Sequence, residues 1–98
     1  MRIDCAMEAP EAVTVDVAIV GSGAAGQAAA RRLLARGRSV VLIESGGLDH
    51  DPAPADLNRG EIVGQPYHPL EHSRLRFFGG TTAIWGGRCA EFDAIDFE

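Results

Sequence analysis

Three glycines early in the chain have a spacing that can do chemistry. Gly21, Gly23 and Gly26 form the pattern G-x-G-x-x-G. In such a pattern the first glycine permits a sharp turn out of a strand, the second lets the backbone approach a pyrophosphate, and the third lets a helix pack close to the sheet. A helix that starts near Ala24 and Ala25 directs its free N–H groups and its positive end at the phosphates. The spacing therefore indicates a dinucleotide-binding turn.

A carboxylate follows where such a site recognises a ribose. Glu44 ends the apolar run 39–43, 18 residues after Gly26, and Ser45 follows it directly. At that position a carboxylate can accept hydrogen bonds from the hydroxyls of an adenosine ribose. It also repels a 2′-phosphate, which disfavours NADP. The alternative interpretation is a glycine-rich turn that binds nothing, with Glu44 as a solvated strand end.

Two strands and a helix are needed to hold these residues in place. The β-branched, mostly apolar run 13–20 predicts a strand that is covered on both faces. Residues 27–36 are strong helix formers, Ala30 keeps the contact between helix and sheet close, and Gly37 is placed to end the helix. Residues 39–44 predict a second buried strand. The expected fold class is α/β, a Rossmann-like βαβ dinucleotide-binding unit with a parallel strand pair.

A second glycine-rich segment, residues 76–87, is too rich in glycine for a simple turn. Two glycine pairs bracket Thr81, Thr82 and Trp85. Glycines permit a close approach of the backbone to a ligand, and the two hydroxyls can bond to phosphate or ribityl oxygens. The alternative is a glycine-rich loop in which Trp85 fills a core.

Together the two segments resemble the N-terminal part of the glucose–methanol–choline (GMC) family of FAD-dependent oxidoreductases. The resemblance extends over approximately residues 15–98, and the second segment is what points to this family. The family has a Gly-Gly-Ser/Thr-Ser/Thr stretch there, then an asparagine three residues on, then glycine. Residues 79–82 match that stretch, Trp85 occupies the asparagine position, and Gly86 and Gly87 follow. The resemblance implies that the segment runs along the FAD pyrophosphate toward the isoalloxazine ring.

The departures from the family's pattern also carry implications. Trp85 in place of asparagine is similar to a sugar-oxidising branch, the pyranose oxidases. In that branch a histidine before the tryptophan attaches FAD covalently, whereas this chain has Ile84, which has no nucleophile. The resemblance therefore implies noncovalent FAD. The expected cofactor contacts are Gly21, Gly23, Ala24, Ala25, Gly26, Glu44, Ser45, Gly80, Thr81, Thr82, Trp85 and Gly86.

The reaction that the resemblance implies is oxidation of a CH–OH group of a small-molecule alcohol or sugar. In the family the base is a histidine near the C-terminus of a much longer chain, and no residue here matches it. We therefore nominate no catalytic residue. The expected organisation is a lead-in at residues 1–12 and the N-terminal portion of an incomplete FAD-binding domain at 13–98, without a substrate domain. We expect such a fragment to retain FAD weakly and to show no turnover alone.

Two other classes of protein remain open. An NAD-binding dehydrogenase fragment would use the first glycine turn and leave the segment 76–87 without a role. A small noncatalytic nucleotide-binding module would be complete at 98 residues and would melt cooperatively.

Composition narrows the partners and the compartment. The formal net charge of −5 argues against nucleic acid or an anionic membrane surface as a partner. Cys5 and Cys89 are isolated, so a disulfide framework is not expected and a cytoplasmic setting is the expectation. His68 and His72 have a metal-ligand spacing, but Pro69 lies between them and no further ligand is near, so no metal site is expected. The oligomeric state stays open.

Overall fold

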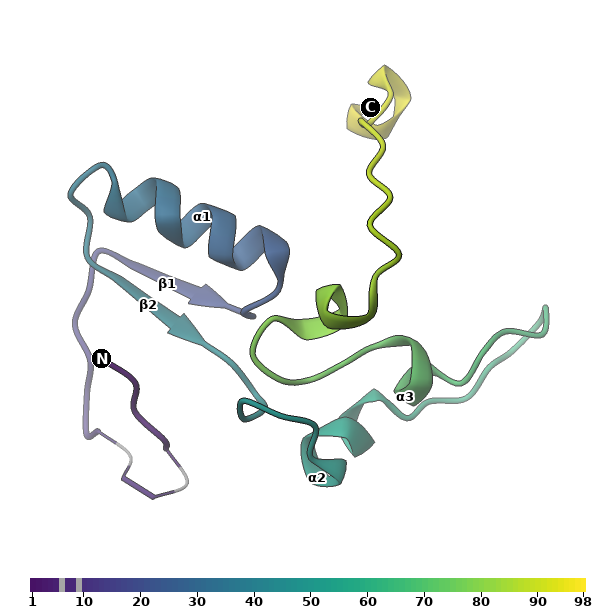
Figure 1. Cartoon of the computed structure of the whole chain (residues 1–98), viewed down its shortest axis with the longest axis horizontal. Coiled ribbons are helices and arrows are strands. Elements are labelled where there is room, and N and C mark those ends of the chain that lie inside the picture. Colours follow the sequence, from purple (N-terminus) through teal and green to yellow (C-terminus); the bar gives the residue numbers. More distant parts are fainter. Residues whose placement is uncertain (6, 9) are drawn as a thin grey trace.

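The computed structural model of the chain describes residues 1–5, 7–8 and 10–98 and contains one strand–helix–strand unit (Figure 1). Strand β1 (Val17–Val20) is followed by helix α1 (Ala24–Leu34) and strand β2 (Val40–Ile43). The strands pair in parallel, with Val17 opposite Val40 and Val20 opposite Ile43. The small α/β fold with a parallel strand pair is therefore as expected, and it is compatible with a Rossmann-like unit that binds FAD.

The strands are shorter than the sequence predicts. Residues 13–16 lie outside β1, because their partners would have to come before Val40, where the chain is still turning away from α1. Side chains replace the ladder at this end of the pair. The Ser39 hydroxyl and N–H donate to Asp16 Oδ2 at 2.7 and 2.8 Å, and the Asp16 N–H donates to Ser39 Oγ at 2.9 Å. These bonds join the starts of the two strands.

Helix α1 ends in the turn that Gly37 was predicted to make. Gly37 has a φ of +74°, a conformation that glycine adopts without strain. Its N–H donates to the Leu34 carbonyl at 2.9 Å, and the Arg38 N–H donates to the Leu33 carbonyl at 3.1 Å. This pair of bonds is the Schellman arrangement that satisfies carbonyls at a helix end. The predicted role of Gly37 is confirmed.

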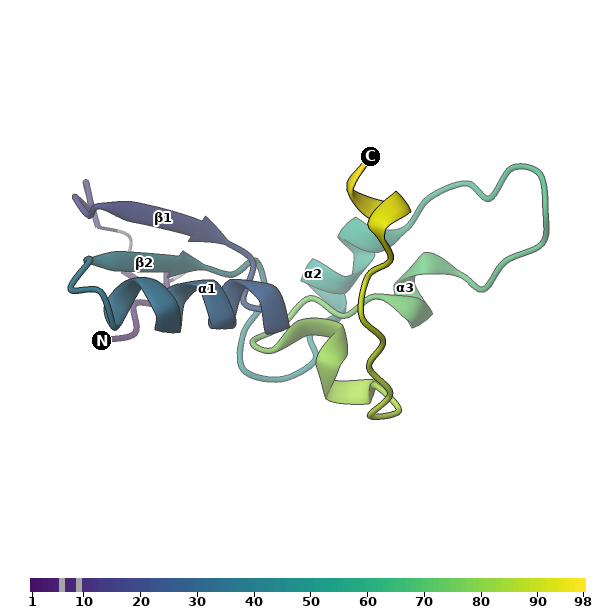
Figure 2. The ribbon, with the colours of Figure 1, turned by 90° about the horizontal axis from the view of Figure 1, so that it is seen from above.

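The strands are covered less than expected. Helix α1 lies along one side of the strand pair (Figure 2), and Ala30 on it is the buried hydrophobic residue among those described, at 9% exposure. In β1 the half-buried Val17 and Ile19 alternate with exposed neighbours. Val20 is 84% exposed and Ile43 is 48% exposed. The prediction of strands buried on both faces is therefore wrong, because alternate β1 residues and both strand ends stay open to solvent.

The second half of the chain consists of short helical turns joined by loops. Residues 48–74, predicted to be an irregular excursion, contain single turns where a proline starts a helix, as Pro52 does next to the capping carboxylate of Asp51. The elements are α2 (Pro52–Ala55), the 3₁₀ turn η1 (Asp56–Asn58), α3 (Leu70–Ser73), and the 3₁₀ turns η2 (Gly80–Ile84) and η3 (Ala94–Phe97).

The chain as a whole is extended for its length. Its radius of gyration is 16.2 Å, against about 13 Å for a compact domain of this size. The C-terminal residues run away from the other elements and end in η3 (Figure 1). Within the described part of the chain, no helix combines the length and apolar content needed to cross a bilayer.

Candidate functional site

The first glycine turn joins the end of β1 to the start of α1. Gly21 has a φ of +97°, and its N–H donates to the Ile43 carbonyl of β2 at 2.7 Å. A Cβ atom on Gly26 would lie 2.0 Å from the Gly21 carbonyl oxygen and 3.5 Å from Ile19 Cγ2. No side chain fits at Gly26, so its backbone approaches the strand as the sequence predicts.

The space in front of Gly23 is open and faces the start of helix α1. A Cβ atom on Gly23 would meet no atom within 4 Å. Gly23 is also the N-cap of α1, where no side chain caps the helix and the first turn contains no acid. The N–H groups of the exposed Ala24 and Ala25 and the positive end of the helix are thus available to an anion. This arrangement fits a pyrophosphate group.

Glu44 lies directly beneath this turn and is bound to it. The Ser22 hydroxyl donates to Glu44 Oε2 at 2.7 Å, and the Ser22 N–H donates to the same oxygen at 2.9 Å. The other oxygen, Oε1, accepts from the N–H groups of Ser45 at 2.9 Å and Gly46 at 3.2 Å, and from the Ser45 hydroxyl at 3.3 Å. A ribose hydroxyl would have to share these oxygens with the protein's own donors.

These hydrogen bonds keep Glu44 ionised. Partial burial raises the pKa of its carboxyl group, but the bonds from Ser22, Gly46 and Ser45 favour the charged form and together outweigh the burial. The pKa of Glu44 therefore lies below its ordinary value of 4.5. The carboxylate carries a full charge at neutral pH.

The second glycine segment meets the first although 57 positions separate them. The Gly79 N–H donates to Ser22 Oγ at 3.1 Å. A Cβ atom on Gly80 would lie 3.6 Å from Gly23 Cα, and the Phe78 N–H donates to the Gly47 carbonyl at 2.9 Å. In Figure 1 the green loop before η2 lies beside the start of α1. The expected proximity of the two segments is observed.

The two threonines of this segment help to fold it. Thr82 Oγ1 donates its hydrogen to the Gly79 carbonyl, so it can only accept from a ligand in this arrangement. Thr81 Oγ1 accepts from the Leu75 N–H at 3.1 Å and retains its own hydrogen for donation. Thr81 is therefore the better donor for a phosphate or ribityl oxygen.

Trp85 and Gly86 lie beyond η2 and face solvent. Trp85 is 56% exposed, so it does not fill a core, and that alternative interpretation is wrong. A Cβ atom on Gly86 would meet no atom within 4 Å. Both residues leave room around the backbone, and their predicted contact with a cofactor stays a prediction.

Sequence reasoning missed the residues that brace the second segment. Arg76 Nε donates to Asn58 Oδ1 at 2.8 Å, and its Nη1 donates to Ser45 Oγ at 3.2 Å. Asn58 is 9% exposed and donates to the Arg74 carbonyl at 3.0 Å. A buried amide inside an irregular loop gives no signal in spacing or periodicity. Ser22 was missed too, because its position between two glycines says nothing about its hydroxyl.

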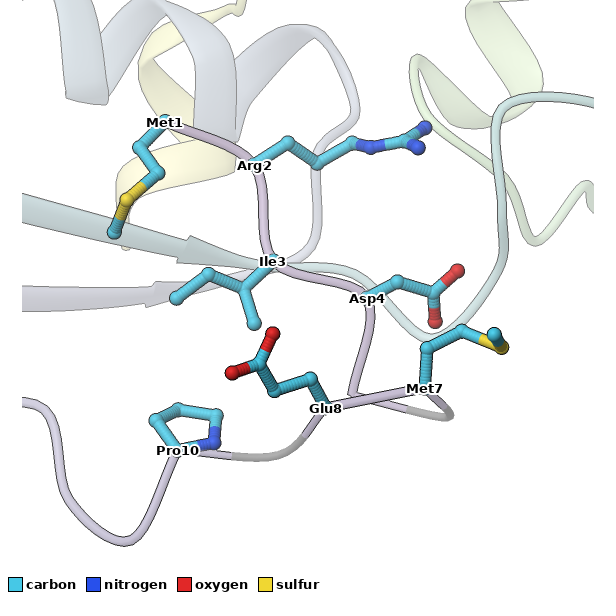
Figure 3. Close-up of a pocket in the computed structure, with 7 residues that line it drawn as sticks. All are labelled: Met1, Arg2, Ile3, Asp4, Met7, Glu8 and Pro10. Atoms are coloured by element: carbon cyan, nitrogen blue, oxygen red, sulfur yellow. The ribbon is translucent and has the colours of Figure 1, made fainter.

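A hollow of about 470 Å³ lies elsewhere, among the residues of the N-terminal segment itself (Figure 3). Its lining comes from residues between Met1 and Pro10, among them Ile3 and Glu8. None of the predicted cofactor contacts is among the residues that line it. The chemistry indicated by the sequence therefore belongs to the glycine segments and not to this hollow.

Comparison with known families agrees with this geometry. The sequence model of a family described as FAD dependent oxidoreductase matches residues 16–98, which is most of the chain. The chain belongs to this family of FAD-dependent oxidoreductases. FAD is accordingly its cofactor. No curated protein and no solved structure matches the chain.

The residues present fit the cofactor of an FAD-dependent oxidoreductase. The open space before Gly23 and the uncapped start of α1 suit the pyrophosphate, and Gly80 of the second glycine segment lies next to that turn. Glu44 is held at the carboxyl end of β2, below the turn. These groups bind and orient a cofactor, and none of them is assigned a catalytic step.

Proposed function

We propose that the chain forms the FAD-binding portion of a GMC-type oxidoreductase that acts on CH–OH groups of alcohols or sugars. The hydrogen bond from the Gly79 N–H to Ser22 Oγ carries the proposal. It brings the family-like segment 79–82 to the dinucleotide-binding turn, where one extended cofactor can contact both. A plain NAD site would need only the first of the two segments.

Each part of the site has a proposed role toward FAD. The N–H groups of Ala24 and Ala25 bind the pyrophosphate, with Gly21, Gly23 and Gly26 allowing the approach. Glu44 and Ser45 bind the adenosine ribose. Gly80, Thr81, Thr82, Trp85 and Gly86 follow the cofactor toward its ring. FAD attachment is noncovalent, since Ile84 offers no nucleophile.

The proposed substrate is a small molecule with a CH–OH group. Bound FAD supplies the ring system that accepts a hydride. The chain's own residues hold the cofactor and keep its phosphates against the start of α1. The net charge of −5 supports the absence of nucleic acid and anionic membrane partners. The isolated Cys5 and Cys89 support a cytoplasmic setting.

Parallel titrations with FAD and NAD test the proposal. We expect FAD to bind more tightly, because only FAD has the ribityl chain and isoalloxazine ring proposed to contact the second glycine segment. Quenching of flavin fluorescence reports its binding. The matched variant is Gly23→Ala. Gly23 has a φ of −66°, which alanine adopts, and the added methyl group enters open space where the pyrophosphate is expected. We expect an unchanged circular dichroism spectrum and an FAD affinity that is lower by about tenfold or more.

The same FAD-loaded chain then tests whether it turns over a substrate by itself. We expect no reduction of a dye with an alcohol or a sugar, because no residue of the chain is assigned as the base. Dye reduction would place a base within the chain. Tighter binding of NAD than of FAD would contradict the proposal.

A further inference from the structure

Ser22 is the most deeply buried residue of the described chain, with no exposed surface. Its hydroxyl donates to Glu44 Oε2 at 2.7 Å and accepts from the Gly79 N–H at 3.1 Å. Its N–H donates to Glu44 at 2.9 Å, and its carbonyl accepts from Gln27 Nε2 at 2.8 Å. Every polar atom of this buried residue therefore has a partner.

The partners of the Ser22 hydroxyl come from two other parts of the chain. Glu44 follows β2, and Gly79 precedes η2. Removal of the hydroxyl would leave the Gly79 N–H without its acceptor and would take one charge-assisted bond from Glu44. Such losses lower the stability of a buried contact, because no water replaces the missing hydrogen-bond partner.

We propose that Ser22 is a positioning residue that holds the second glycine segment against the first, so that the two segments form one continuous binding surface for FAD. The buried hydroxyl does not touch the cofactor. It acts through Gly79, which places Gly80 against Gly23, and through Glu44, which it orients. The inference rests on the proposed function, in which both glycine segments hold the same FAD molecule.

Ser39 offers a matched control at the opposite end of the same strands. Its hydroxyl and N–H donate to Asp16 Oδ2 at 2.7 and 2.8 Å, which repeats the bonds between Ser22 and Glu44. Ser39 joins the starts of β1 and β2 and has no bond to either glycine segment. Loss of either hydroxyl removes a serine–carboxylate bond, and only the loss at Ser22 also removes a bond to the second glycine segment.

The test compares Ser22→Ala with Ser39→Ala in the full chain by two measurements. FAD affinity is measured by flavin fluorescence, and amide hydrogen exchange is measured without FAD at Gly79, Gly80 and Leu42. For Ser22→Ala we expect an affinity about 10- to 100-fold lower and faster exchange at both glycines, with Leu42 unchanged. For Ser39→Ala we expect an affinity change of about threefold or less and unchanged exchange at the glycines.

The inference would be overturned if the two substitutions changed amide exchange at the glycines and FAD affinity to the same extent. Unchanged exchange at Gly79 in Ser22→Ala would also overturn it, whether or not FAD binds. Failure of the wild-type chain to bind FAD would instead contradict the proposed function, and the exchange data would still decide the role of Ser22. If Ser22→Ala unfolds, Ser22→Cys keeps a side chain of similar shape whose sulfur is a weaker acceptor for the Gly79 N–H. Wild-type exchange at Gly79 in that variant would overturn the inference.

Discussion

At the scale of single residues, two serine–carboxylate pairs join the two strands. Ser22 binds Glu44 at the carboxyl end of the strands, beside the glycine segments, and Ser39 binds Asp16 at the other end. Hydrogen bonds from the serine side chain and backbone lower the pKa of Asp16 below its ordinary value of 3.8. In both pairs the protein stabilises the ionised carboxylate, which makes the fold sensitive to acid.

The lowered pKa of Glu44 predicts how stability changes with pH. A carboxylate whose pKa is lower in the folded chain than in the unfolded chain stabilises the fold in its ionised form. This contribution is complete at a pH above the unfolded-state pKa of 4.5, and it is lost as the pH falls through the folded-state pKa. We expect the free energy of unfolding, measured in urea by circular dichroism, to be constant above about pH 5 and to decrease below it.

Variants assign this pH dependence to Glu44. Glu44→Gln presents amide hydrogens to the N–H groups of Ser22 or Ser45. We therefore expect the free energy of unfolding to be lower by about 1–3 kcal/mol at neutral pH and to decrease less steeply below about pH 5. Because the pKa of Asp16 is also lowered in the folded chain, Glu44→Gln is compared with wild-type Glu44 in chains that both carry Asp16→Asn. An unchanged decrease of the free energy of unfolding at acidic pH in the double variant would contradict the assignment.

At the scale of elements, the chain after α3 crosses the carboxyl end of the strand pair. The backbone of residues 75–79 lies on the turn after β2, where Phe78 binds the Gly47 carbonyl and Arg76 binds Ser45. A Cβ atom on Gly46 would lie 2.0 Å from the Arg76 carbonyl oxygen. The close contact is between backbones, so no flexible side chain can move aside.

Adjacent glycines in this turn test the contact. We expect Gly46→Ala to lower the free energy of unfolding by about 2 kcal/mol or more, because the methyl group forces the crossing backbone away. Gly47→Ala is the control, since a Cβ atom there would meet no atom within 4 Å, and we expect a change within about 0.5 kcal/mol. Urea unfolding measures both variants. Equal free energies of unfolding for Gly46→Ala and Gly47→Ala would show that the backbone at Arg76 does not pack against Gly46.

At the scale of the whole molecule, little apolar surface is withdrawn from water. Ala30 is the buried hydrophobic residue among those described, while Phe92, Ile95 and Phe97 near the C-terminus are each more than 70% exposed. Burial of apolar surface is the main favourable term in folding. A ligand that joins distant segments therefore has a large effect on a chain of this kind.

FAD is expected to stabilise the chain against heat. At a free concentration 100 times its dissociation constant, a ligand that binds only the folded state adds about 2.7 kcal/mol to the free energy of unfolding. We expect FAD to raise the thermal midpoint, and riboflavin, which lacks the pyrophosphate and the adenosine, to raise it much less. Equal shifts from the two compounds would show that the glycine segments do not bind the pyrophosphate.

Local geometry made part of this protein predictable from its sequence. The order of strand, helix and strand, the turn at Gly21, the close approach at Gly26 and the helix end at Gly37 each depend on neighbouring residues. A positive φ or the absence of a Cβ atom acts on the adjacent backbone, so composition and spacing reveal it. The sequence alone thus determined the glycine turn between strand and helix and, through its resemblance to FAD-dependent oxidoreductases, FAD as the cofactor.

Contacts between distant residues were decided only by the tertiary structure. The bond between Ser22 and Gly79 and the bracing of Arg76 by Asn58 do not follow from spacing. The open strand faces were also missed, because an apolar run predicts a strand without showing what covers it. Each of these features depends on which segments the folded backbone brings together, and a linear pattern does not contain that information.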